Sequence, residues 1–163
     1  MNVDSAFYIT FWLVIIALTI FALIYVIFSY EKLGGISDLS ERVTLLEARD
    51  FLQWSAILLG IAVLFLVLVL GFIVAYGFND VYEIPAAVCL LYIGFLVWFL
   101  VTLVLLIVAY ERLGSSADIL QLTDVQIARR DLFVTLAGVA TISALLTLGY
   151  FGYVYRMDNF YTC

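Results

Sequence analysis

The sequence predicts an all-α integral membrane protein, a four-helix bundle built from two parallel two-helix repeats. Three observations lead to this prediction. First, 67% of the 163 residues are hydrophobic and 12% are charged, whereas soluble domains have about 45–50% apolar and about 25% charged residues. Second, the charged residues are confined to short segments between four long uncharged ones. Third, a short motif recurs eighty positions later.

Each of the four uncharged segments is long enough to cross a membrane. A helix needs roughly 20 apolar residues to cross a ~30 Å hydrocarbon core, and a backbone in lipid must satisfy its own hydrogen bonds, which favours helices. A soluble bundle would require a polar face on each helix, and none of the segments has a continuous one. The predicted spans are residues 5–30, 51–79, 84–110 and 132–155.

The segment before the first span contains no lysine or arginine. A cleavable signal peptide has a basic region before its apolar core. We therefore expect the first span to be retained as a membrane helix.

The recurring motif divides the chain into two units, residues 1–79 and 80–163. Tyr30-Glu31-Lys32-Leu33-Gly34 recurs as Tyr110-Glu111-Arg112-Leu113-Gly114, and Arg49-Asp50 recurs as Arg130-Asp131, eighty-one positions later. Each unit contains two spans, so both units have the same orientation in the membrane. The sequence therefore predicts a parallel repeat related by an axis along the membrane normal.

The two segments that follow the motif have interpretable patterns. Gly34 and Gly114 are placed to end their helices as C′ glycines. After the first of them, Leu39, Val43 and Leu46 form an apolar stripe at helical spacing. Such a stretch either lies at the membrane interface or extends the next span beyond the membrane. We favour the extension.

Positive charge is distributed unevenly between the two sides of the predicted bundle. Three lysines or arginines lie between the two spans of each unit, six in total, and one, Arg156, lies on the other side. Cytoplasmic loops carry the excess of positive charge in membrane proteins. The sequence therefore places both termini on the non-cytoplasmic side and leaves the type of membrane open. The six residues are Lys32, Arg42, Arg49, Arg112, Arg129 and Arg130.

The residue types that carry most membrane chemistry are missing from the predicted spans. The chain has no histidine, and no acidic or basic residue lies within a span. Cys89 and Cys163 are far apart in the sequence, and neither a disulfide nor a compartment follows from this pair. A free thiol at Cys89, near the start of the third span, would act as a small hydrophobe. The hydroxyls of Ser143 and Thr147 are expected to bond carbonyls of the preceding turn. The sequence thus predicts no catalytic residue, no cofactor and no metal site.

Small residues spaced four apart occur in the second and fourth spans. The pairs are Ala56 with Gly60 and Ala140 with Ala144. Small residues at this spacing let membrane helices approach closely. We interpret both pairs as helix-packing faces, some inside the bundle and others open to partner helices.

These features favour a non-enzymatic protein that serves as a structural or accessory subunit of a larger membrane assembly. An energy-converting complex and the internal membrane of a large virus are two possible settings. The alternative is a small oligomeric channel or permeability factor, which requires a polar stripe that the sequence does not contain. A membrane enzyme acting on lipid or quinone is the least supported, because histidine and intramembrane acids are absent.

The expected partners follow from the same composition. They are the lipid bilayer and other membrane-protein subunits. The chain has no polybasic cluster, so nucleic acid is not an expected partner. No small-molecule substrate is evident.

Overall fold

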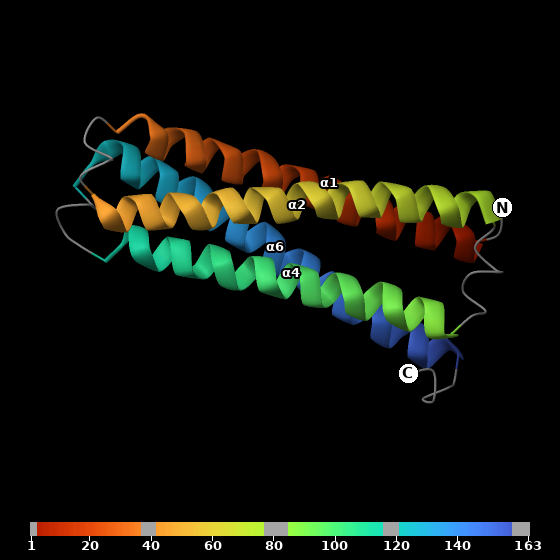
Figure 1. Cartoon of the computed structure of the whole chain (residues 1–163). Helices are drawn as coiled ribbons and strands as arrows, with labels where there is room; N and C mark the ends of the chain where they lie inside the picture. The colour runs from red at the N-terminus through yellow and green to blue at the C-terminus, as the bar shows by residue number, and fades with distance from the viewer. Residues whose placement is uncertain (1–2, 37–41, 77–84, 116–120, 158–163) are drawn as a thin grey trace.

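The computed structural model describes residues 3–36, 42–76, 85–115 and 121–157. Throughout these ranges the chain is helical and contains no strand. The helices are α1 (Val3–Gly34), α2 (Val43–Tyr76), α4 (Pro85–Leu113) and α6 (Thr123–Met157) (Figure 1). The predicted all-α class is confirmed.

All four helices are long and apolar enough to cross a membrane. The candidate spans are Ala6–Gly34, Val43–Ala75, Ala87–Leu113 and Thr123–Tyr153, with mean hydropathies of 2.9, 3.3, 2.8 and 2.0. Each overlaps one of the four spans that the sequence predicts. Helices of this length and composition indicate an integral, multi-pass membrane protein.

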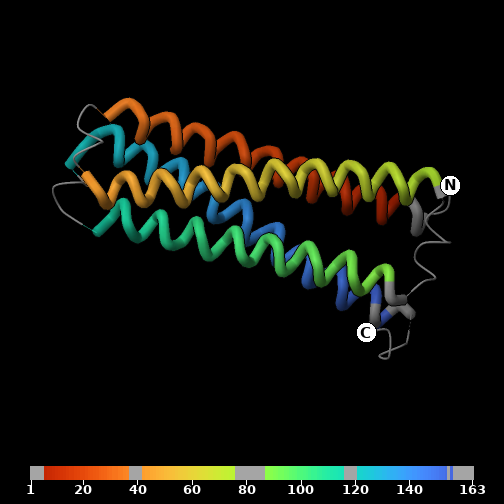
Figure 2. Tube along the Cα trace, in the orientation of Figure 1, coloured from red at the N-terminus to blue at the C-terminus, as the bar shows by residue number. Residues whose placement is uncertain are grey.

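The helices form a bundle in which neighbours run in opposite directions (Figure 2). Helix α1 packs against α2 and α6, and α4 packs against the same two helices. The ends of α1 and α4 that carry the recurring motif lie together with the starts of α2 and α6 (left in Figure 1). We call this the motif end. We call the other end, where α1 and α4 begin, the aromatic end.

Helices α2 and α6 begin well before the uncharged segments. Each is continuous from Val43 and Thr123, respectively, into its membrane span. The prediction that these stretches extend the spans is therefore confirmed.

The predicted apolar stripe at the start of α2 is not the buried face. Val43 is 66% exposed, and the fully buried residues are Leu45, Ala48 and Leu52. Each residue turns the helix by about 100°, so Val43 faces away from the side that contains Leu45 and Ala48. Leu39 lies outside the described residues.

The core is a row of buried side chains along each helix, and the rows on α2 and α6 follow the same spacing. Buried residues on α2 have buried counterparts eighty positions later on α6. Lipid tails are as apolar as these side chains, so close packing and hydrogen bonds hold such helices together, rather than hydrophobic burial. The α2 residues are Leu45, Ala48, Leu52, Leu59, Ala62 and Leu66, and the α6 residues are Val125, Ala128, Leu132, Val139, Ile142 and Leu146.

Candidate functional site

At the motif end, an arginine joins the start of α2 to the end of α1. The guanidinium carbon of Arg49 lies 4.0 Å from the centroid of the Tyr30 ring, and Arg49 Nε donates to the Tyr30 carbonyl at 3.5 Å. A Cβ added at Gly34 would lie 2.6 Å from Arg49 Nη2. The glycine therefore leaves the space in which the arginine crosses the end of α1.

The same three residue types meet between α4 and α6. The guanidinium carbon of Arg129 lies 4.0 Å from the Tyr110 ring centroid, and a Cβ at Gly114 would lie 2.7 Å from Arg129 Nη2. Arg129 Nε is buried and has no hydrogen-bond partner in the described part of the chain. The ring is therefore a principal contact of this guanidinium, and such contacts contribute about 0.5–2 kcal/mol depending on exposure.

This contact corrects one residue match made from the sequence. The sequence pairs Arg49 with Arg130, but the arginine that stacks on Tyr110 is Arg129. A shift of one residue rotates a side chain by about 100° around the helix, so Arg130 is exposed on another side of α6. The contacts of the two arginines therefore share the eighty-residue spacing of the Tyr-to-Gly motif.

The two glycines end their helices for a reason other than the one that the sequence suggests. Helix α1 ends at Gly34, and α4 ends one residue before Gly114, as predicted. Neither glycine adopts the left-handed backbone of a C′ glycine. Close approach of an arginine, rather than backbone conformation, explains both positions.

The other motif residues separate into buried leucines and exposed charges. Leu33 and Leu113 are fully buried, while Glu31, Lys32, Asp50 and Glu111 are exposed. A partly exposed ion pair joins Arg112 on α4 to Glu47 on α2. Exposed pairs of this kind contribute little to stability. The remaining motif residue, Asp131, is buried and lies 3.6 Å from Arg130 Nη2.

Two further side chains hydrogen-bond across helices, and sequence reasoning missed both contacts. Ser29 Oγ donates to the Ala128 carbonyl at 2.9 Å, and Trp98 Nε1 donates to the Leu58 carbonyl at 2.9 Å. An indole N–H in the middle of a span was the available signal for Trp98, because tryptophan usually lies at the membrane interface.

The serine and threonine prediction for α6 is confirmed. Ser143 Oγ donates to the Val139 carbonyl at 3.1 Å, and Thr147 Oγ1 donates to the Ser143 carbonyl at 2.9 Å. Both hydroxyls thus bond the preceding turn of their own helix. They are not arranged as nucleophiles.

The predicted small-residue pairs lie in different environments. Ala56 packs against the core, whereas Ala140 and Ala144 are exposed. A Cβ at Gly60 would meet no atom within 4 Å. These positions, apart from Ala56, have no close neighbour inside the bundle that requires a small residue.

Gly149, a small residue further along the fourth span than Ala140 and Ala144, has close neighbours at the aromatic end. A Cβ at Gly149 would lie 2.7 Å from Phe11 Cζ and 3.1 Å from Tyr92 Cε1. The Tyr92 ring also contacts Trp12 and Tyr150, with centroid distances of 5.4 and 6.2 Å. Gly149 thus lets α6 approach a buried cluster of rings from α1 and α4.

The sequence leaves the pairing of Cys89 open. Its Sγ lies 3.8 Å from Tyr150 Oη, and Cys89 is disulfide-bonded. Cys163, the other cysteine in the sequence, lies outside the described residues.

Within residues 3–36, 42–76, 85–115 and 121–157, no three His, Cys, Asp or Glu side chains are grouped so that they could hold a metal ion. Comparison with known proteins gives no match to a family model, to a curated protein or to a solved structure.

Proposed function

We propose that this polytopic membrane protein is a non-enzymatic structural or accessory subunit that packs within a larger membrane assembly. The observation that carries the proposal is the outward direction of its small residues. Ala140 and Ala144 are exposed on α6, and a Cβ at Gly60 on α2 meets nothing. Small residues on the outer face of a membrane helix let a partner helix approach closely.

The polar side chains inside the bundle also favour a packing role. The buried hydroxyls each lie within hydrogen-bond distance of the carbonyl four residues earlier in their own helix, and that of Ser29 also reaches the Ala128 carbonyl. Few of them are therefore free to line a water path. A pore would instead require polar groups facing a shared aqueous space. These hydroxyls belong to Thr19, Ser29, Ser55, Thr102, Thr135 and Ser143.

A substitution on the outer face of α6 tests this role. Ala144→Leu is expected to release the chain from its complex in mild detergent, without changing the thermal unfolding of the isolated chain. Leu148→Met, at another exposed position of α6, is the control and should leave the complex intact. Migration of the wild type as a free chain, together with a single-channel conductance in liposomes, would replace this proposal with the channel function.

We further propose that the two halves are parallel repeats. This proposal is supported by the eighty-residue spacing that the Tyr–Arg contacts, the glycine contacts and the buried rows share. A rotation that exchanges α1 with α4 and α2 with α6 also preserves which helices are neighbours. An experimental structure in which residues 7–77 and 87–157 fail to superpose would contradict the repeat.

The proposed orientation places the motif end in the cytoplasm, or in its organelle equivalent, and both termini on the opposite side. The six lysines and arginines at the motif end, three in each unit, support this orientation.

The orientation is tested with single cysteines in a background in which Cys89 and Cys163 are replaced by serine. Ser115→Cys at the motif end is expected to react with a membrane-impermeant thiol reagent only after permeabilisation. Tyr155→Cys at the aromatic end should react in intact membranes. The reverse pattern of labelling would invert the topology.

A further inference from the structure

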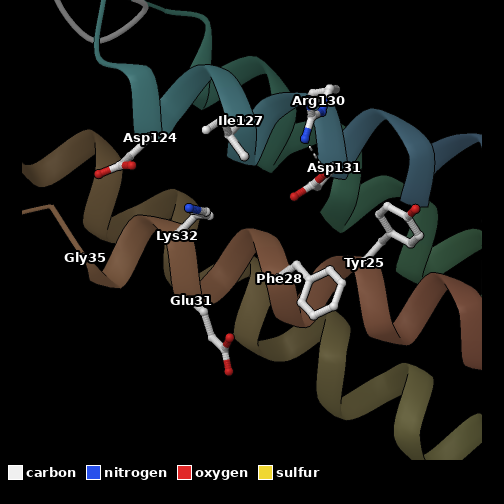
Figure 3. Close-up of a pocket in the computed structure, with 9 residues that line it drawn as sticks. All are labelled: Tyr25, Phe28, Glu31, Lys32, Gly35, Asp124, Ile127, Arg130 and Asp131. Carbon is white, nitrogen blue, oxygen red and sulfur yellow. Dashed lines mark ion pairs between the residues drawn. The ribbon is translucent and has the colours of Figure 1, made fainter.

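A cavity of about 600 Å³ lies between α1 and α6 at the motif end. Figure 3 shows its lining residues along the two helices. Lys32 on α1 points toward α6, Arg130 and Asp131 lie on α6, and Tyr25 and Phe28 lie further along α1 toward the middle of the span. The cavity therefore crosses the boundary between the charged and the uncharged parts of these helices, which is the level of lipid headgroups.

The most unusual group that lines this cavity is the carboxylate of Asp131. The residue is 8% exposed, although an acid at the edge of the hydrocarbon region is costly unless it is paired. Its ion pair in the described chain is with the adjacent Arg130, at 3.6 Å, and the Arg130 side chain is itself 73% exposed. This distance is too long for a hydrogen bond. The carboxylate thus retains capacity to accept hydrogen bonds from a ligand.

The corresponding groove between α2 and α4 has its charges paired differently. There, Arg112 bonds Glu47, and the cavity is about 370 Å³. The residues eighty positions from Arg112 and Glu47 are Lys32 and Ile127, so the acid that pairs with Arg112 has an apolar counterpart in this cavity. Asp124 lies on the same wall of α6 (Figure 3). Lys32 has no ion pair with any residue that the structure describes. The residue of the α2–α4 groove that lies eighty positions before Asp131 is Phe51.

We propose that the α1–α6 cavity binds the headgroup of an aminophospholipid. Lys32 and Arg130 bind the phosphate, and Asp131 accepts hydrogen bonds from the primary ammonium group. Hydrogen bonds between charged groups are about twice as strong as neutral ones. The lining holds the cations Lys32 and Arg130 and three acids, Glu31, Asp124 and Asp131, of which Asp131 is the buried one. A ligand that fits this mixed lining carries both charges.

The surface next to the cavity fits the rest of such a lipid. The rings of Phe21 and Tyr25 lie 4.6 Å apart, and those of Tyr25 and Phe28 lie 6.0 Å apart. Phe21 and Phe28 are exposed large apolar residues. This aromatic row leads from the cavity along α1 into the span, so acyl chains attached to the bound headgroup lie against it. A soluble phosphate ester has no group for this surface.

The proposal is tested by native mass spectrometry of the full chain in detergent, titrated with phosphatidylethanolamine, phosphatidylcholine or phosphatidylglycerol. The wild type is expected to bind phosphatidylethanolamine about tenfold more tightly than either of the others, the equivalent of one charge-assisted hydrogen bond. Choline has no N–H donor, and glycerol has no cation.

Variants separate the roles of the two charges. Asp131→Asn should remove the preference for ethanolamine, and Lys32→Gln should weaken binding of all three lipids. Arg112→Gln, the matched variant in the α2–α4 groove, should change neither the preference for ethanolamine nor the binding of the three lipids. Equal binding of the three lipids, or an Asp131→Asn variant that keeps the preference, would overturn the proposal. Phosphoethanolamine competing as strongly as the intact lipid would show a soluble ligand instead and would also overturn it.

Discussion

The two ends of the bundle bring glycines against very different neighbours. At the motif end, Gly34 and Gly114 face the terminal atoms of Arg49 and Arg129, which are flexible side chains. At the aromatic end, Gly149 faces the rings of Phe11 and Tyr92, which are held among other rings. The close approach is similar in distance at both ends. The cost of adding a side chain therefore depends on whether the neighbour can move.

The largest expected effect is at the aromatic end. Gly149→Leu should destabilise the bundle by about 3 kcal/mol, because overpacking against rigid rings forces helices or side chains out of place. Thermal unfolding in detergent measures the change. Gly60→Leu is the control, since Gly60 has open space around it, and it should shift stability by less than about 0.5 kcal/mol. Equal losses in both variants would contradict the difference in packing.

Removing the arginine at the motif end should have an intermediate effect. Arg49→Ala removes the contact with the Tyr30 ring and the link between α1 and α2, and should cost about 1 kcal/mol. Arg129→Ala should cost about the same, because its guanidinium lies at the same distance from Tyr110. Chemical denaturation of the two variants in parallel measures this. A cost confined to one of them would break the equivalence of the two contacts.

The smallest expected effect is that of adding a methyl group at the motif end. Gly34→Ala should displace the Arg49 guanidinium, while alanine gains up to about 1 kcal/mol in helix propensity over glycine, so the net change should be within a few tenths of a kcal/mol. In the Arg49→Ala background, the same substitution should be stabilising. A double-mutant cycle measures this coupling, and strictly additive effects would show that the guanidinium does not occupy this space.

The spans and the helical class were predictable because they depend on local composition. A long uncharged run indicates a membrane helix wherever its partners lie. The buried face of each helix was less predictable, because a helix that is apolar on all sides has little hydrophobic periodicity. For this reason the apolar stripe through Val43 does not mark the buried face, and the contact with Tyr110 comes from Arg129 rather than from Arg130.

Contacts between distant parts of the chain were not predictable. The role of Gly149 depends on Phe11 and Tyr92, which are remote in the sequence and are brought to it by the bundle. The cavity beside Asp131 likewise requires the pairing of α1 with α6. The recurrence of the motif also does not reveal which of its residues touch, and Arg129, which contacts Tyr110, lies outside the motif as the sequence defines it.

The length of α2 has a consequence for the membrane that surrounds it. From Phe51 to Tyr76 this helix carries no charge, and at 1.5 Å per residue this stretch measures about 39 Å. An average bilayer has a hydrocarbon thickness of about 30 Å, so a perpendicular α2 is hydrophobically mismatched. Tilt or local thickening relieves the mismatch, at a cost of fractions of a kcal/mol per Å. The surplus length of α2 therefore favours a tilted helix in a bilayer of average thickness.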